Sequence, residues 1–239
     1  MKKILLILMC LFIVLACADS IFDFRQIYAD YMAKKQEEEA NEFAEMLKQH
    51  YKNKNDEFEK ENASLTGVDV VFIGDSLTEG YNLPEFYNEF TFANRGIGGD
   101  TTFGVEDRLK VSAYDVNPRV LVLMIGTNNL ESMLENYESI LLKLKDNLPE
   151  TNVIVMSVPP TGEALIDRNP QIALNNVTLK ILAEKHGCTY VDIFTLLYNC
   201  ETGALRAEYT YDDLHFTKEG YDIITDALKP ILLYMLGIN

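Results

Sequence analysis

The sequence predicts a three-layer α/β/α domain preceded by a helical extension. From residue 68 onward, short apolar runs alternate with segments of helical pattern, as in proteins with a parallel sheet covered on both faces. Two of these runs, RVLVLMIG at 119–126 and NVIVMSV at 152–158, are almost continuously apolar, as expected of strands buried on both sides. The stretch from Ser20 to Thr66, by contrast, contains neither glycine nor proline and is rich in charge.

Residues 1–18 are predicted to be an export signal. Two lysines precede an apolar run from Ile4 to Ala16, which is short for a membrane span and typical of a secretory signal. VLAC at 14–17 resembles a bacterial lipobox, in which Cys17 would be lipidated and tether the protein to a membrane. Ordinary cleavage after Ala18 and an uncleaved anchor are the alternatives. The expected location is the bacterial cell envelope or the exterior.

Residues 19–66 are predicted to form a charged helix. The apolar residues Phe43, Met46, Leu47 and Tyr51 recur at helical spacing on one face. A helix that packs on the main domain or acts as a spacer accounts for this pattern. A helix dedicated to binding a partner is the alternative.

Residues 67–239 are predicted to form the main domain, with a flavodoxin-like, five-stranded parallel sheet. Right-handed crossovers would place helices on both faces of this sheet. The expected strands are 69–73, 90–93, 119–125, 152–158 and 189–193. The expected helices are 83–88, 103–113, 132–148, 170–186 and 218–236.

The composition excludes some classes of function. With 48% hydrophobic and 10% aromatic residues among 239, the chain can bury a full core. A formal net charge of −16 argues against nucleic acid as a partner and against passive adhesion to anionic lipid. Of the four cysteines, Cys188 and Cys200 lie in the main domain, and a disulfide between them is an open alternative. No spacing typical of a metal site is present, and no cofactor is expected.

Polar residues follow the predicted strands where the carboxyl edge of the sheet is expected, which is where ligands bind in such folds. Ser76 follows the first strand, Gly98 and Gly99 the second, and Asn128 the third, while His215 precedes the last helix. Each has an ordinary structural explanation. Ser76 can cap a helix, the glycines can form a simple turn, Asn128 can be a turn residue, and His215 can lie on the surface or cap a helix.

Together these residues supply the groups needed to cleave an ester. A serine hydroxyl is a poor nucleophile until a base removes its proton, and His215 can be that base. Asp212, three residues earlier, can reach the imidazole and hold its tautomer. The backbone N–H groups of Ser76 and Gly99 and the amide of Asn128 can donate to the oxyanion that forms.

Four blocks carry a resemblance to a known family: GDSL at 74–77, NRGIGGD at 94–100, GTNN at 126–129 and DDLH at 212–215. Through these blocks the chain resembles the SGNH hydrolases, the GDSL family of esterases and lipases. The resemblance covers about residues 68–236. The resemblance implies Ser76 as nucleophile, His215 as base, Asp212 as its orienting carboxylate, and Gly99 and Asn128 as oxyanion donors. The third block, which commonly ends in aspartate, here ends in Asn129. Asp213, where the family often has glycine, is a competitor for the role of Asp212.

The family does not define the substrate, which could be a small-molecule, carbohydrate or lipid ester. Short loops around the site and the acidic surface favour short acyl groups, such as acetyl on carbohydrate, over long-chain lipid. The alternatives are an acyltransferase acting on glycan hydroxyls, a lysophospholipase and a non-catalytic glycan-binding module. No block lies in the extension, so removal of residues up to about Asn53 is expected to leave hydrolysis largely intact.

Overall fold

The computed structural model describes residues 2–238, including the side chains of residue 26 and of residues 28–238. The chain divides into two compact units, Met1–Gln49 and His50–Asn239. One long helix, α1 (Lys2–Asn62), contributes to both. The part of α1 at 50–62, which the sequence assigns to the extension, therefore falls in the second unit.

The first unit is the amino-terminal part of α1, and most of its described side chains are exposed. Its charged residues pair along the helix, as in Lys34–Glu38 at 3.6 Å and Lys35–Glu39 at 3.5 Å. Phe43 and Met46, expected on a packed face, are 58% and 56% exposed. The export signal and Cys17 lie outside the residues whose side chains are described, so both stay predictions. Where side chains are described, no helix has the length and apolar character needed to cross a membrane.

The second unit contains the predicted parallel sheet of five strands, in the order β2-β1-β3-β4-β5. This order, with helices on both faces, confirms the predicted three-layer α/β/α fold. Gly74 at the end of β1 lies beside Gly96 of β2 and Met124 of β3, so the three blocks that follow these strands emerge side by side. The strand order changes direction at β1, because β2 lies on one side of it and β3 on the other, and open α/β sheets bind ligands at such a point. The strands are β1 (Val70–Gly74), β2 (Phe92–Gly96), β3 (Val120–Met124), β4 (Asn152–Met156) and β5 (Thr189–Val191).

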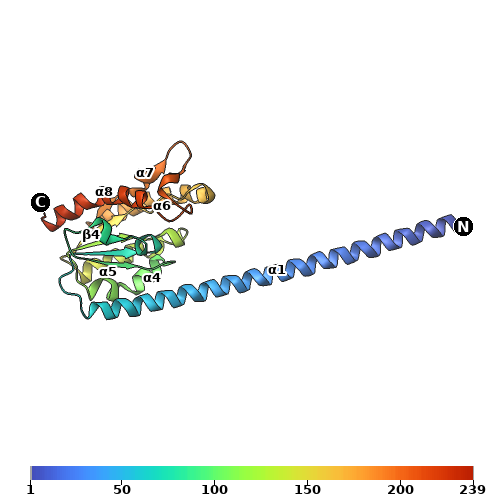
Figure 1. Cartoon of the computed structure of the whole chain (residues 1–239), viewed down its shortest axis with the longest axis horizontal. Coiled ribbons are helices and arrows are strands. Elements are labelled where there is room, and N and C mark those ends of the chain that lie inside the picture. The colour runs from blue at the N-terminus through green and yellow to red at the C-terminus, as the bar shows by residue number, and fades with distance from the viewer. Residues whose placement is uncertain (1, 239) are drawn as a thin grey trace. The chain divides into compact units, whose positions relative to one another are not determined.

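Helices connect the strands and cover the sheet. The α-helices after α1 are α2 (Ser76–Glu79), α3 (Leu83–Phe86), α4 (Thr102–Asp107), α5 (Leu134–Asn147), α6 (Asn169–Lys185), α7 (Ile193–Leu197) and α8 (Lys218–Leu236). The chain also contains a π-helical turn, η1 (Lys110–Tyr114), three 3-10 turns, η2 (Thr127–Asn129), η3 (Glu163–Arg168) and η4 (Ala207–Tyr209), and a small hairpin, β6 (Tyr198–Asn199) and β7 (Ala204–Leu205). Within the second unit, α7 and α8 lie on one side of the sheet and α4 and α5 on the other (Figure 1).

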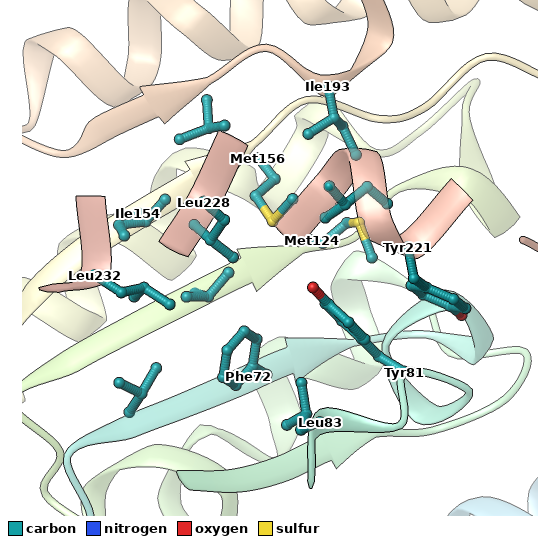
Figure 2. Packing of buried hydrophobic residues seen from close by; sticks show 14 of the residues in the cluster. Phe72, Tyr81, Leu83, Met124, Ile154, Met156, Ile193, Tyr221, Leu228 and Leu232 are labelled. Carbon is teal, nitrogen blue, oxygen red and sulfur yellow. The ribbon is translucent and has the colours of Figure 1, made fainter. Parts of the chain in front are cut away.

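Two apolar layers hold these helices to the sheet. Successive residues of β1 and β3 alternate between the layers, so both faces of each strand are buried. Figure 2 shows one layer, in which Phe72 of β1 and Met124 of β3 pack with Leu228 and Leu232 of α8. The other layer joins Ile73 and its neighbours to α4, α5 and α6.

One strand differs clearly from its predicted position. The sequence predicts a strand at 90–93, whereas β2 runs from Phe92 to Gly96 and so includes Arg95. Arg95 is 1% exposed, and its guanidinium donates to Glu61 Oε2 at 2.6 Å and to Asn62 Oδ1 at 2.8 Å. A charged residue is tolerated in this strand because α1 supplies its partners, a contact that local sequence pattern does not reveal.

Candidate active site

Ser76 is held at the carboxyl edge of the sheet by the turn that follows β1. A side chain at Gly74 would lie 2.2 Å from Met124 O and from Thr78 Oγ1, so only glycine fits between the neighbouring strand and α2. Asp75 then caps α2 by accepting a bond from Leu77 N at 3.0 Å. Ser76 is thus the first residue of α2, and Gly74 and Asp75 together define where this helix begins.

His215 connects Ser76 to Asp212. Its Nε2 lies 2.9 Å from Ser76 Oγ, although the two residues are 139 positions apart. Its Nδ1 lies 2.7 Å from Asp212 Oδ2. The ring of Tyr211 stacks on the imidazole with 5.9 Å between centroids. The structure therefore brings together the three residues that the sequence proposes as nucleophile, base and orienting carboxylate.

The loop around Asp212 decides which of the two adjacent aspartates faces the histidine. Asp212 Oδ1 accepts from Leu214 N at 3.0 Å and from His215 N at 2.6 Å, so the carboxylate closes a tight turn. Asp213 has φ of +68°, and its carbonyl accepts from Gly162 N at 2.8 Å. Asp212 is the aspartate in contact with His215.

The glycine-rich block forms a turn over the same edge. Asp100 N donates to Ile97 O at 3.1 Å, which closes a four-residue turn with Gly98 and Gly99 at its centre. Gly99 has φ of +76°, the conformation that the third position of a type II turn requires and that favours glycine.

The two asparagines of the third block have different contacts. Asn128 Nδ2 donates to Asp100 O at 2.9 Å, which ties it to the glycine turn. Asn129 Nδ2 donates to Thr102 Oγ1 at 2.9 Å, and its Oδ1 accepts from Thr102 N at 3.3 Å, at the start of α4. Asn128 is therefore associated with the predicted oxyanion turn, while Asn129 supports the helix that follows it.

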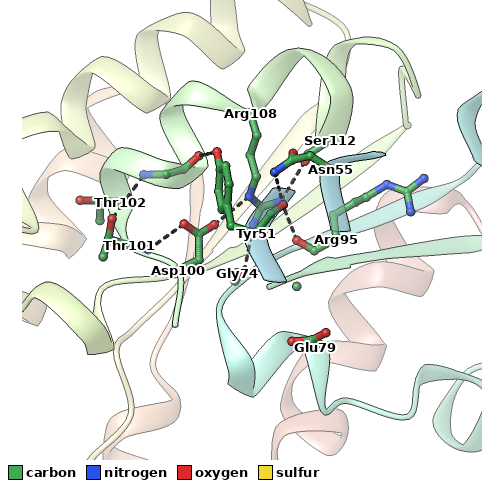
Figure 3. Close-up of polar contacts among 12 residues, drawn as sticks. Tyr51, Asn55, Gly74, Glu79, Arg95, Asp100, Thr101, Thr102, Arg108 and Ser112 are labelled. Carbon is green, nitrogen blue, oxygen red and sulfur yellow. Dashed lines mark hydrogen bonds and ion pairs between the residues drawn. The ribbon is translucent and has the colours of Figure 1, made fainter. Parts of the chain in front are cut away.

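A buried arginine that the sequence analysis did not single out links these segments. Arg108 and Asp100 form an ion pair of 2.8 Å with side chains only 1% and 3% exposed. Arg108 also donates to Gly74 O at 3.0 Å, to Arg95 O at 2.8 Å and to Ser112 Oγ at 2.8 Å (Figure 3). One side chain thus joins the ends of β1 and β2 to the glycine turn. In the sequence, only the spacing of eight residues between Asp100 and Arg108 could have indicated this ion pair.

The carboxyl group of Asp75, next to Ser76, is buried. Asp75 is 1% exposed, and its Oδ2 has no hydrogen-bond partner among the described residues. Burial raises the pKa of Asp75 to about 7, although the bond from Leu77 N acts in the opposite direction. Its ordinary value is 3.8. Asp75 therefore keeps its proton in the folded protein over a range in which the unfolded chain has lost it.

Asp75→Asn is expected to change the pH dependence of stability. Because the folded state binds one more proton between about pH 4 and pH 7, wild-type stability falls as the pH rises through this window, by up to ~4 kcal/mol from this group. Asparagine keeps the capping oxygen and does not titrate, so the variant should lack this contribution. Urea unfolding of both proteins from pH 4 to pH 7.5 measures the difference. Parallel profiles would contradict the prediction.

Cys188, Cys200 and His186 make no hydrogen bond to the site residues described above. Cys188 and Cys200 are both free thiols, so the disulfide that the sequence left open does not form. His186 Nε2 pairs with Glu138 Oε1 at 2.8 Å. No group of three metal-ligating side chains occurs in the part of the chain whose side chains are described.

Comparison with known proteins adds independent findings. Residues 72–223 match the model of the GDSL-like lipase/acylhydrolase family. The platelet-activating factor acetylhydrolase IB subunit alpha2 of Rattus norvegicus is 32% identical over 178 residues, which cover 70% of this chain and 77% of that protein.

Solved structures agree with this match. A GDSL-like lipase of Bacteroides thetaiotaomicron has 27% identity and a TM-score of 0.66, covering 74% of this chain and 96% of that one. A structure from Streptococcus pneumonia, named for platelet activating factor, has 27% identity and a TM-score of 0.74 over 80% of this chain and 96% of that one.

Proposed function

The chain belongs to the GDSL-like lipase/acylhydrolase family and is a hydrolase, and on this premise we propose that it is a serine esterase acting on short acyl esters. The observation that carries the proposal is the continuous contact from Ser76 Oγ through His215 to Asp212, with distances of 2.9 and 2.7 Å. This geometry meets the requirement that nucleophile, base and orienting group lie within hydrogen-bond reach of one another.

The reaction proceeds in two halves through an acyl-enzyme. Ser76 Oγ attacks the ester carbonyl carbon while its proton passes to His215 Nε2. The tetrahedral intermediate collapses, the bond to the alcohol oxygen breaks, and His215 returns the proton to the departing alcohol. Water then attacks the acyl-serine by the same route, with His215 again taking the proton, and the acid is released as Ser76 recovers its hydrogen.

Asp212 supports the imidazolium that forms in each half. Burial alone would raise the pKa of Asp212, but hydrogen bonds from the backbone and imidazole of His215 and from Leu214 N outweigh it and lower the pKa. The carboxylate is thus held in its charged form, facing Nδ1. A negative charge at that position orients the ring and stabilises its protonated state.

The oxyanion is assigned to the backbone N–H groups of Ser76 and Gly99 and to the amide of Asn128. Two features support this assignment: the positive φ of Gly99 and the bond between Asn128 Nδ2 and Asp100 O, which holds the amide beside the glycine turn. An amide nitrogen has two hydrogens, so Asn128 can make this bond and still donate to the oxyanion.

We assign the acyl half to acetyl or a similarly short group and the alcohol half to a carbohydrate. The acetylhydrolase relatives support a short acyl group. A cavity of about 480 Å³, lined in part by Asn128, supports a polar alcohol, since most of the side chains that line it form hydrogen bonds readily. They are Asn128, Asn129, Leu130, Glu131, Ser132, Asp167, Arg168 and Gln171.

A panel of esters tests this function. With p-nitrophenyl esters of increasing chain length, kcat/KM should be highest for acetate and fall steadily toward octanoate. Acetylated xylose should be cleaved, whereas a lysophospholipid should not. Highest activity on octanoate or on the lysophospholipid would identify the lysophospholipase alternative. Transfer of acetyl to added sugar in preference to water would identify the acyltransferase alternative.

A further inference from the structure

Glu79 bridges the helix that carries Ser76 and the glycine turn. It is the last residue of α2, three positions after Ser76. Its Oε2 accepts from Gly98 N at 2.6 Å and lies 3.0 Å from His50 Nε2 in α1. Its other oxygen, Oε1, is 3.9 Å from Lys54 Nζ. The carboxylate therefore has a backbone donor from the turn on one side and basic side chains from α1 on the other.

The peptide beside this contact is the one whose orientation matters for catalysis. In the turn from Ile97 to Asp100, the central peptide joins the carbonyl of Gly98 to the N–H of Gly99. Type I and type II turns differ mainly by a flip of this central peptide. With glycine at both central positions, the backbone can adopt either orientation at low steric cost. A flip would put a carbonyl oxygen where the oxyanion needs a donor.

The surroundings of the turn restrain it from two directions. On one side, Asn128 holds Asp100 O and Arg108 holds the Asp100 carboxylate. On the other, a side chain added at Gly98 would lie 3.1 Å from Glu79 Oε2 and 3.7 Å from His50 Nε2, so these two groups sit directly against the turn. Glu79 thus restrains the half of the turn that Asn128 and Arg108 do not reach.

We propose that Glu79 is a positioning residue for the oxyanion donor Gly99, and that His50 of α1 orients the Glu79 carboxylate. The proposal rests on the function proposed above, in which Gly99 N is an oxyanion donor. It makes residues 50–62 of α1 a supporting part of the active site. A chain lacking residues up to Asn53 would lose His50 and also Tyr51, whose hydroxyl donates to Gly104 O at 2.9 Å. On this proposal such a truncation lowers activity, contrary to the expectation from the sequence.

Glu79→Ala should lower kcat for p-nitrophenyl acetate by about tenfold while changing KM by less than about twofold. Complete loss of an oxyanion donor costs about 10²–10³ in kcat, and a donor that is present but poorly oriented should cost part of that. Glu79→Gln keeps an oxygen that can accept from Gly98 N, so it should restore kcat to within about threefold of wild type. His50→Ala should show a smaller loss in kcat, again without a matching rise in KM.

A second ion pair provides a matched control. Glu138 contacts His186 at 2.8 Å and Lys185 at 2.6 Å, so it has the same kinds of partners as Glu79, but on α5 and at the end of α6. Glu138→Ala and His186→Ala should keep wild-type kcat. The rate at which a fluorophosphonate modifies Ser76 gives a second readout, because its phosphoryl oxygen needs the same donors. This rate should fall in Glu79→Ala and not in Glu138→Ala.

The outcomes separate this proposal from the function on which it rests. Wild-type kcat in Glu79→Ala, with Ser76→Ala inactive, overturns the positioning role and leaves the esterase intact. A loss that Glu138→Ala shares, or that appears in KM rather than kcat, also overturns it. If Glu79→Ala does not fold, wild-type kcat in His50→Ala overturns the proposal, and so does a loss of kcat in Glu79→Gln well beyond threefold. Hydrolysis that persists in Ser76→Ala overturns the proposed function itself.

Discussion

Replacing Ser76 with alanine is expected to reduce kcat by about a millionfold, the largest effect of any single change in this protein. Removing the nucleophile of a serine hydrolase triad has a cost of this order, because no other group can form the acyl-enzyme. His215→Ala should be nearly as severe, since Ser76 Oγ would lose the base that lies 2.9 Å away. Hydrolysis of p-nitrophenyl acetate measures the loss, and fluorophosphonate labelling should disappear in both variants.

Matched substitutions separate the triad from general damage. Ser64→Ala alters an exposed serine outside the site and should keep full activity. Asp212→Asn should lower kcat by about 10⁴, because the amide favours the wrong imidazole tautomer. Asp213→Asn should be close to wild type, since asparagine tolerates the φ of +68° at that position. Labelling of Ser76→Ala at the wild-type rate, or a greater loss in Asp213→Asn than in Asp212→Asn, would contradict the assignment.

Asn128→Ala should lower kcat about a hundred- to a thousandfold, equivalent to roughly 2.7–4 kcal/mol of transition-state stabilisation. The amide donates to charge that exists only in the transition state, so KM should change little. Asn128 is exposed, which favours an unchanged melting temperature for the variant. Steady-state kinetics and thermal unfolding of the same preparation measure both quantities.

Asn129→Ala is the control, since it removes a neighbouring amide that bonds to Thr102. It should cost stability at the start of α4 and reduce kcat far less than Asn128→Ala. Asn129→Ala as the more damaging change to kcat would show that the oxyanion donor has been assigned to the wrong asparagine. A similar loss in both variants would indicate that the third block acts as a structural turn.

Much of the architecture follows from local sequence pattern. Near-continuous apolar runs identify β3 and β4, because strands buried on both faces have no polar side. The helix predicted at 218–236 coincides with α8. Parallel strands end at one edge of a sheet, so the blocks after β1, β2 and β3 could be expected to meet there, as they do.

Other features depend on contacts that local pattern does not contain. The strand β2 extends through Arg95, a charged residue whose partners Glu61 and Asn62 come from α1. The choice between Asp212 and Asp213 depends on backbone conformation, since φ of +68° turns Asp213 away while Asp212 closes its own turn. Neither could be read from the identity of the residues alone.

The sequence by itself therefore determined the α/β class, the order of the elements and the chemical groups available at one edge of the sheet. These depend on short-range periodicity and on residue type. Only the tertiary structure decided which groups are in contact: Ser76 with His215 across 139 residues, Arg108 with the carbonyls of Gly74 and Arg95 and the carboxylate of Asp100, and Glu79 with both His50 and Gly98. The physical reason is that a hydrogen bond requires atoms to approach within about 3 Å at a suitable angle, and folding sets that geometry between residues far apart in the chain.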